Sequence, residues 1–371
     1  MQGISIISDN IFSPLGKTTA ENFAHLKNGS SGIELITNSD LSSESFYSSM
    51  FQHDFNNGNY TKFEQILIAS MQDALNNCDI NVKDKKTIFI LSSTKGNIDL
   101  LDKKVYNEEL KERIALHTSA KLIAEHFGFI NKPLIISNAC ISGVLAILTA
   151  KRLLESGQYE NAIIAGADIV SKFVLSGFQS FQAISSQPCK PFDANRSGLT
   201  LGETAGTLIL SSDKKYSSNI KVVSGSVSND ANHLSAPSRT SEELSMAIQK
   251  TLRNANIFER EIDFISAHGT ATLYNDEMEA KAISLSKLES TPVNSLKGFY
   301  GHTLGAAGII ESAVTIQSMR ENIIIPTKGF EKIGVSKPVN ICDNLQKKSL
   351  NNCLKIASGF GGCNAAILFS N

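Results

Sequence analysis

Short apolar runs alternate with stretches of helical apolar spacing along the whole chain. The runs are rich in β-branched residues and are bounded by polar residues or glycine, a pattern typical of buried strands. Strands are expected at residues 87–91, 133–137, 161–165, 207–210 and 365–369. Helices are expected at residues 63–76 and 141–156, where apolar residues recur with helical spacing. This alternation predicts an α/β fold with largely buried sheets.

The polar stretch 211–219 divides the chain into two halves, which we predict as residues 1–212 and 219–371. Each half contains a strand, a turn with small residues, a helix and a return strand. These units are 133–137, 141–156 and 161–165 in the first half, and 292–296, 306–319 and 322–325 in the second. The similarity predicts an internal duplication that places the two turns near each other across a pseudo-twofold axis.

Composition and charge argue against several classes of function. Of the 371 residues, 42% are hydrophobic and 19% are charged, as in an ordinary globular protein. A net charge of −1 predicts neither a nucleic-acid partner nor an anionic membrane surface. The most apolar long stretch, 134–150, is too short and too polar for a membrane span.

The beginning of the chain and its cysteines bear on the compartment. The first ten residues lack a basic segment followed by a long apolar one, so no secretion signal is expected. Six cysteines show no CxxC pair and no metal-ligand spacing. We therefore expect a cytoplasmic protein with free thiols and no metal.

The segment SNACISG at 137–143 places Cys140 between an apolar strand and an apolar helix. A tight turn there presents the side chain at a helix N-terminus, where unpaired N–H groups and the positive end of the helix dipole favour a thiolate. The small neighbours Ala139, Ser142 and Gly143 allow a sharp turn and close approach of a substrate. A nucleophile and a small buried core cysteine both fit this segment.

Three turns in the second half carry further candidates. His268 follows the apolar run 262–266, His302 lies in KGFYGHTLGAAG at 297–308, and Phe360 lies in SGFGGCN at 358–364. A neutral imidazole in such a turn can donate a hydrogen bond or exchange a proton near pH 7. The glycines beside Phe360 leave a backbone N–H exposed, as an oxyanion hole requires. Structural histidines, close helix packing at 305–308 and a simple β-turn are the alternatives.

Taken together and in this order, the segments resemble the β-ketoacyl synthase branch of the thiolase superfamily nearly end to end. Residues 13–16 and 29–32 look like the family's opening, and PFDANRSGLTLGETAG at 191–206 resembles its PFD-R-G-GE-AG signature. NIIIPT at 322–327 resembles its NIIPPT motif. The resemblance implies a thiolase-like fold whose two duplicated halves form a layered αβαβα core. It also implies decarboxylative Claisen condensation of an acyl group with malonyl-acyl-carrier protein.

The same resemblance implies roles for individual residues. Cys140 matches the nucleophile that takes the acyl chain from a carrier-protein thioester, and His268 and His302 complete a Cys-His-His triad that stabilises the enolate. Lys297 and Glu279 match a supporting lysine and glutamate that pair near the site and orient the histidines.

By the same matching of positions, the backbone N–H groups of Cys140 and Phe360 form the oxyanion hole. The ring of Phe360 matches the gate of the acyl pocket.

The resemblance implies no metal or organic cofactor, because the substrates arrive on the phosphopantetheine arm of an acyl carrier protein. That carrier is the expected partner, within a homodimer or a heterodimer with a related synthase subunit.

Some segments depart from the family pattern. Residues 46–59 lack its usual basic pattern, and LSSTKGN at 91–97 replaces a glycine-rich turn. In the signature, Ser197 stands in place of an aspartate and Thr204 in place of a glycine. Acyl length and pathway (fatty acid, aryl polyene or another polyketide) therefore stay open.

Two other functions remain as alternatives. A non-catalytic chain-length partner typically loses the cysteine, which this chain retains. A thiolase normally has a second catalytic cysteine ahead of a C-terminal glycine cluster, whereas Cys363 follows Gly361 and Gly362.

Overall fold

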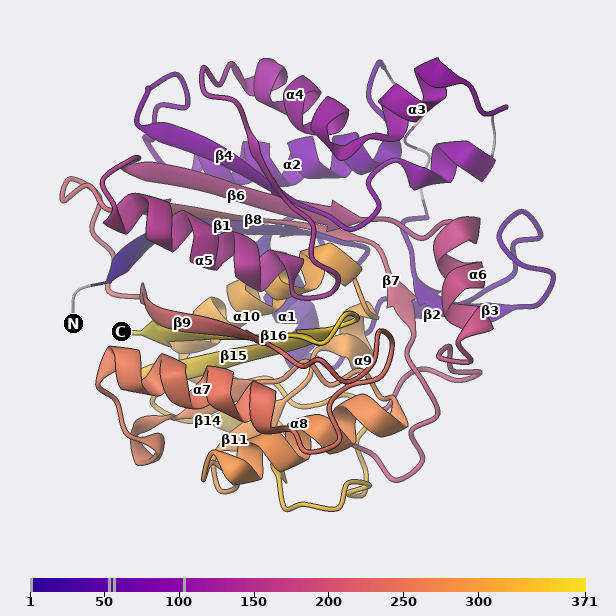
Figure 1. The fold of residues 1–371 in the computed structure, drawn as a ribbon, viewed down its shortest axis with the longest axis vertical. Coiled ribbons are helices and arrows are strands. Elements are labelled where there is room, and N and C mark those ends of the chain that lie inside the picture. The colour runs from indigo at the N-terminus through magenta and orange to yellow at the C-terminus, as the bar shows by residue number, and fades with distance from the viewer. Residues whose placement is uncertain (1–2, 53–54, 56–57, 103–104) are drawn as a thin grey trace.

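The computed structural model describes residues 3–52, 55, 58–102 and 105–371. Its elements form five layers that alternate between helices and sheets, from α2 and α4 on one side to α7 and α8 on the other (Figure 1). The layered αβαβα core predicted from the sequence is therefore confirmed.

Strands of the described residues form one large sheet and two small ones. The large sheet has the order β13-β11-β10-β15-β16-β9-β1-β8-β6-β4-β5. Its strands are β1 (Ile4–Phe12), β4 (Thr87–Ser92), β5 (Leu134–Ile136), β6 (Asn161–Asp168), β8 (Thr204–Ser211), β9 (Lys221–Asn229), β10 (Phe264–Ser266), β11 (Pro292–Asn294), β13 (Asn340–Ile341), β15 (Asn352–Gly359) and β16 (Cys363–Ser370). The small sheets comprise β2 (Ile33–Ile36), β3 (Phe46–Ser49) and β7 (Leu201–Gly202), and β12 (Ile323–Ile324) and β14 (Gln346–Lys347).

The helices connect and cover these strands. They are α1 (Thr19–Lys27), α2 (Lys62–Asn76), α3 (Glu108–Ile114), α4 (Leu116–Phe127), α5 (Ser142–Glu155), α6 (Lys172–Ser180), α7 (Glu242–Ala255), α8 (Leu273–Leu285), α9 (Lys297–Tyr300) and α10 (Ala307–Glu321). Three short 3-10 helices are η1 (Ile98–Asp102), η2 (Glu259–Glu261) and η3 (Leu304–Ala306).

The two halves of the large sheet repeat one topology. In the first half, β1-β8-β6-β4-β5 pair as two antiparallel and then two parallel neighbours. In the second half, β9-β16-β15-β10-β11 pair in the same sequence of directions. Among the described strands, a short pairing between β1 and β9 joins the two halves of the large sheet, and their repeated order confirms the predicted duplication.

One detail of the predicted duplication is wrong. Residues 322–325 were expected to return to the sheet as the counterpart of β6. Instead β12 pairs with β14 in a separate two-stranded sheet. β15 occupies the place equivalent to β6, because it lies between β16 and β10 in the repeated order.

Helices α5 and α10 fill the layer between the two half-sheets (Figure 1). α5 packs against β6 on one side and β16 on the other, and α10 packs against β8 and β15. Because it touches a sheet on each side, α10 is buried over almost its whole length. An apolar helix with no solvent-facing side is the expected result.

The backbones of α5 and α10 approach closely at two glycines. A Cβ on Gly308 would lie 2.4 Å from the Val144 nitrogen, and a Cβ on Gly143 would lie 2.7 Å from the Ile309 nitrogen. Only glycine fits at these distances, so the packing interpretation of residues 305–308 is confirmed for Gly308. The contact lies near the N-terminal ends of both helices and brings the turns before them together.

Two further sequence expectations concern the periphery. Residues 53, 54, 56 and 57 of the divergent segment 46–59 lie outside the described residues. Within the described part of the chain, no helix has the length and apolarity needed to cross a membrane.

Replacing Gly308 by Ala is expected to lower the free energy of unfolding by about 1–3 kcal/mol, the usual cost of overpacking. The reason is that the new methyl group would overlap the backbone of α5. Urea unfolding measures the change. Gly177→Ala in α6 is the control, because a Cβ there meets nothing within 4 Å. The control should be neutral or stabilising by up to about 1 kcal/mol; equal losses in both variants would contradict this account of the helix contact.

Candidate active site

Cys140 lies in a tight turn between β5 and α5. Ala139 adopts a left-handed conformation with φ of 44°, which is unusual for a residue with a side chain. Ser142 stabilises the turn: its Oγ accepts the Asn138 N–H at 2.7 Å and donates to the Ala139 carbonyl at 2.6 Å. The turn therefore presents Cys140 just ahead of the N-terminus of α5, as the sequence predicted.

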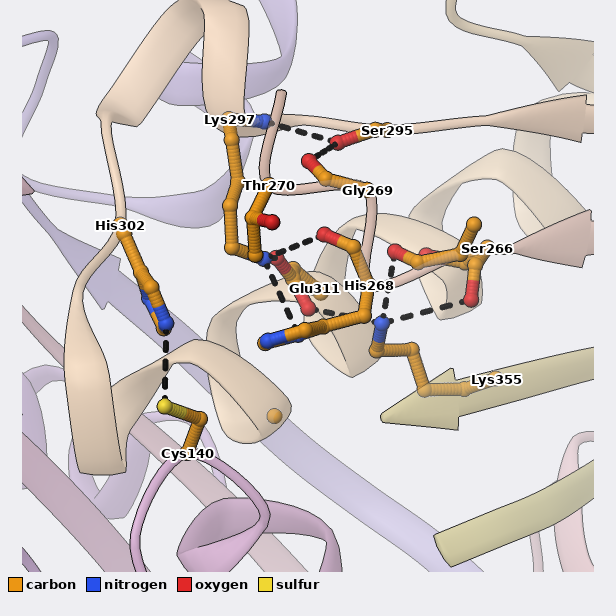
Figure 2. Close-up of polar contacts among 12 residues, drawn as sticks. Cys140, Ser266, His268, Gly269, Thr270, Ser295, Lys297, His302, Glu311 and Lys355 are labelled. Atoms are coloured by element: carbon orange, nitrogen blue, oxygen red, sulfur yellow. Dashed lines mark hydrogen bonds and ion pairs between the residues drawn. The ribbon is translucent and has the colours of Figure 1, made fainter. Parts of the chain in front are cut away.

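Three predicted residues meet at this point. The Nε2 atom of His302 lies 3.1 Å from the Cys140 Sγ atom, and the rings of His268 and His302 are 5.1 Å apart in an edge-to-face arrangement. The sulfur and one nitrogen from each imidazole lie within 4.8 Å of one another. Figure 2 shows the two imidazoles converging toward the sulfur from different segments. Both histidines are buried.

The hydrogen bonds to the other ring nitrogens assign the tautomers. The Leu304 N–H donates to Nδ1 of His302 at 3.2 Å, and the Lys297 ammonium donates to Nδ1 of His268 at 3.3 Å. Burial, followed by the positive charge of Lys297, holds the pKa of both histidines well below its usual range. Each imidazole is therefore neutral and carries its proton on Nε2. The Nε2–H of His302 is a donor toward the sulfur, and His268 lies beside it.

Burial also controls the thiol of Cys140. It raises the pKa of the thiol to about 11, while Lys297 and a hydrogen bond from the Phe360 N–H act in the opposite direction. The expected preference for a thiolate at the helix N-terminus is thus outweighed by desolvation. The resting group is a thiol surrounded by donors that stabilise the anion once it forms.

Lys297 is buried beside the His268 ring. Its ammonium donates to the His268 carbonyl at 2.6 Å and to Oε1 of Glu311 at 2.6 Å, in addition to the ring of His268 (Figure 2). The prediction that Lys297 pairs with Glu279 is wrong, because Glu311 is its partner. Glu311 reaches Lys297 from α10, one turn beyond the glycine contact with α5.

Glu279 supports the same histidine from the opposite side. Its carboxylate accepts the N–H groups of His268 at 2.7 Å and Gly269 at 2.6 Å, and also the Asn275 amide at 2.8 Å. Burial and then the charge of Asp276 raise the pKa of Glu279 to about 7. Glu279 therefore holds the backbone of the His268 turn and does not contact the Lys297 ammonium.

Sequence reasoning missed several buried charged residues near the site, among them Asp168, Glu311 and Lys355. Asp168 accepts hydrogen bonds from residues 93–95 and from the Gly305 N–H, which ties the LSSTKGN segment to the turn after His302. Glu311 directly follows the apolar run 306–310, and Lys355 lies within the apolar run 353–357. A single charged residue in an apolar stretch is the sequence signal that could have identified them, because a buried charge requires a partner.

A cavity of about 340 Å³ opens onto the three reactive groups. Phe360 lines it and contacts the rings of Phe178 and Phe181 at centroid distances of 5.8 and 5.6 Å. Gly361 and Gly362 both have positive φ values, so the turn at Phe360 depends on glycine. The Phe360 N–H donates to Cys140, so its backbone contacts the thiol while its ring lines the cavity beside that thiol.

The trio of one thiol and two imidazoles is also a donor set that zinc accepts. The charges around it disfavour a divalent cation, however. The ammonium of Lys297 lies next to the His268 ring, and His302 directs an Nε2–H toward the sulfur instead of a lone pair.

Comparison with known proteins matches both halves of the chain. A model of the β-ketoacyl synthase N-terminal domain matches residues 1–216, and a model of the β-ketoacyl synthase C-terminal domain matches residues 220–331. The chain is 25% identical to 3-oxoacyl-[acyl-carrier-protein] synthase 2 of Vibrio harveyi over 400 residues, covering 97% of this chain and 96% of that enzyme. It is 31% identical over 250 residues to the enzyme of the same name from Rhizobium meliloti (strain 1021), covering 62% and 58% of the two chains.

A solved structure supports the fold. The ketosynthase of Xenorhabdus doucetiae, solved in complex with its chain length factor, aligns with a TM-score of 0.88 and 24% identity. The alignment covers 100% of this chain and 98% of that chain. The predicted thiolase-like fold is confirmed.

The rate of Cys140 alkylation by iodoacetamide is expected to rise about tenfold per pH unit from pH 6 to pH 9, because the thiolate fraction increases in this way below a pKa of about 11. Peptide mass spectrometry separates Cys140 from the other cysteines, and Cys140→Ala identifies its peptide. A rate that levels off near pH 7 would show a resting thiolate and contradict the role of burial.

Proposed function

This chain belongs to the β-ketoacyl synthase family, and we propose that Cys140, His268 and His302 perform its condensation of an acyl group with malonyl-acyl-carrier protein. One observation carries the assignment of these residues. The Cys140 sulfur lies 3.1 Å from a histidine nitrogen, and both histidines are set as neutral Nε2–H donors beside it.

In the first step, Cys140 accepts the acyl group from a carrier-protein thioester. The sulfur attacks the carbonyl carbon, the new sulfur–carbon bond forms, and the carrier thiolate leaves and takes up the proton that Cys140 gives up. The N–H groups of Cys140 and Phe360 stabilise the oxyanion, as expected for donors that lie beside the sulfur.

In the second step, malonyl thioester loses carbon dioxide. The bond to the carboxylate breaks and its electrons move into an enolate, whose oxygen accepts hydrogen bonds from Nε2 of His268 and His302. Neutral donors already oriented in a buried site stabilise this developing charge without reorganisation. Lys297 supports the step indirectly, because its ammonium occupies Nδ1 of His268 and leaves the proton on Nε2.

In the third step, the enolate carbon attacks the acyl carbonyl on Cys140. The carbon–carbon bond forms, the bond between the acyl carbon and the Cys140 sulfur breaks, the leaving thiolate takes up a proton from solvent, and β-ketoacyl-carrier protein is released. The cavity next to Phe360, Phe178 and Phe181 would hold the acyl chain, with Phe360 as its gate.

We also propose the assembly and the carrier on the same basis. The substrates would arrive on the phosphopantetheine arm of an acyl carrier protein, with no further cofactor. The chain would act as a homodimer or with a related synthase subunit, and its halves would be residues 1–212 and 219–371. The predicted cytoplasmic location and the pathway, fatty acid or polyketide, stay predictions.

An inert chain-length partner is disfavoured by the intact contact between Cys140 and His302. The thiolase alternative is disfavoured by the second histidine beside Cys140 and by the place of Cys363, which follows the C-terminal glycines instead of preceding them.

Replacing Cys140 by Ala is expected to abolish condensation by at least about 10³-fold and to preserve release of carbon dioxide from malonyl-acyl-carrier protein, because decarboxylation requires the histidine donors and not the thiol. Labelled carbon dioxide and product analysis measure the two reactions separately. His268→Ala is the matched variant and should lose decarboxylation by about 10²–10³-fold, the usual effect of removing one such donor.

Unchanged condensation by Cys140→Ala would exclude Cys140 as the nucleophile. In that case the native protein, incubated with acyl-carrier proteins that bear acyl chains of different lengths, would show no acyl group on its Cys140 peptide by peptide mass spectrometry.

A further inference from the structure

Lys355 is a charged residue in the middle of strand β15, and its side chain is completely buried. Burial of an ammonium is costly unless charges and carbonyls surround it. Lys355 has both: its Nζ atom lies 2.7 Å from Oε2 of Glu311 and donates to three backbone carbonyls. Burial lowers the pKa of Lys355, and Glu311 opposes that shift.

Lys355 and Lys297 share Glu311. Oε1 of the carboxylate pairs with Lys297 at 2.6 Å and Oε2 pairs with Lys355 (Figure 2). Without Lys355, the negative charge of Glu311 would act on Lys297 alone. Because Lys355 shares the carboxylate, Glu311 neutralises only part of the positive charge of the Lys297 ammonium beside the His268 ring.

Lys355 also fixes the backbone that leads to His268. Two of its carbonyl partners are Ser266 at 3.3 Å and Ala267 at 3.0 Å, at the end of β10. The next carbonyl, that of His268, accepts from Lys297. Three consecutive carbonyls are thus bound by two ammonium groups, while Glu279 binds the N–H groups on the other side of the turn.

We propose that Lys355 is a positioning residue for the decarboxylation step: it shares Glu311 with Lys297 and fixes the end of β10, so that His268 stays a neutral donor aimed at the enolate. This role rests on the proposed function. It differs from catalysis itself, because Lys355 touches neither the cysteine nor the histidine rings among its recorded contacts.

The charged and titratable groups that face His268 determine the sign of the effect. They are Lys297 from α9, Lys355 from β15, Glu311 from α10, Glu279 and Asp276 from α8, His302 beside it, and the Cys140 thiol within 4.8 Å. The charge of Lys355 helps to lower the pKa of both His268 and His302. Removing one positive charge raises these pKa values, so protonated histidine appears at a higher pH.

Lys355→Met tests the proposal in the Cys140→Ala background, where decarboxylation is measured without acyl transfer. We expect the rate at pH 7 to fall about tenfold and the acid limb of the pH–rate profile to move up by about one pH unit, the shift that a buried neighbouring charge produces. Lys348→Met is the matched control, because Lys348 also donates to a backbone carbonyl, Asp263 O at 2.7 Å, ahead of the start of β10. Its acid limb should not move.

A loss of rate that follows the loss of folded protein, with an unmoved acid limb, would overturn the proposal and show a purely structural lysine. If the methionine variant does not fold, Lys355→Gln removes the charge and keeps a donor for the carbonyls, and the same shift is expected.

Imidazole NMR separates failure of the proposed role of Lys355 from failure of the proposed function. An inactive Cys140→Ala protein would count against the proposed decarboxylation. A titration of His268 in ¹⁵N-labelled native protein and in Lys355→Met would still decide the role of Lys355: a raised pKa in the variant supports it, and an unchanged pKa overturns it.

Discussion

The contact between helices α5 and α10 at Gly143 and Gly308 is the constraint on which the site depends. A duplicated α/β fold supplies a helix from each half to the central layer, and two glycines let these backbones meet near their N-termini. The turn ahead of each helix is thereby brought to one point. Cys140 and His302, which are 162 residues apart in the chain, come within hydrogen-bond distance for this reason. Any side chain at the contact would separate them.

Buried charge determines what these groups can do. Burial alone makes the thiol of Cys140 harder to ionise and the histidines harder to protonate. It does not select a tautomer. That selection comes from Lys297 and the Leu304 N–H, which occupy the two Nδ1 atoms. The same arrangement thus disfavours general-base catalysis by either histidine and favours stabilisation of an anionic oxygen.

Much of this arrangement was predictable from the sequence, and the misses have physical reasons. Cys140, His268, His302 and Phe360 lie in turns with small or glycine residues, so the local pattern made them candidates. Their joint occurrence in one order, and the family resemblance that it carries, gave them their roles. The partner of Lys297 was missed because ion pairs depend on tertiary packing: Glu311 lies on α10, whereas Glu279 turned toward backbone N–H groups. Residues 322–325 show the same limit, since an apolar run predicts a strand and not the sheet that it joins.

The most direct test of the central claim is a single-turnover measurement on the native protein carrying a labelled acyl group on Cys140. After malonyl-acyl-carrier protein is added, the account predicts one carbon dioxide released for each acyl group that leaves the Cys140 peptide, and an equal amount of β-ketoacyl-carrier protein. Release of carbon dioxide without loss of the label from Cys140, or product formed while no label is attached there, would contradict it.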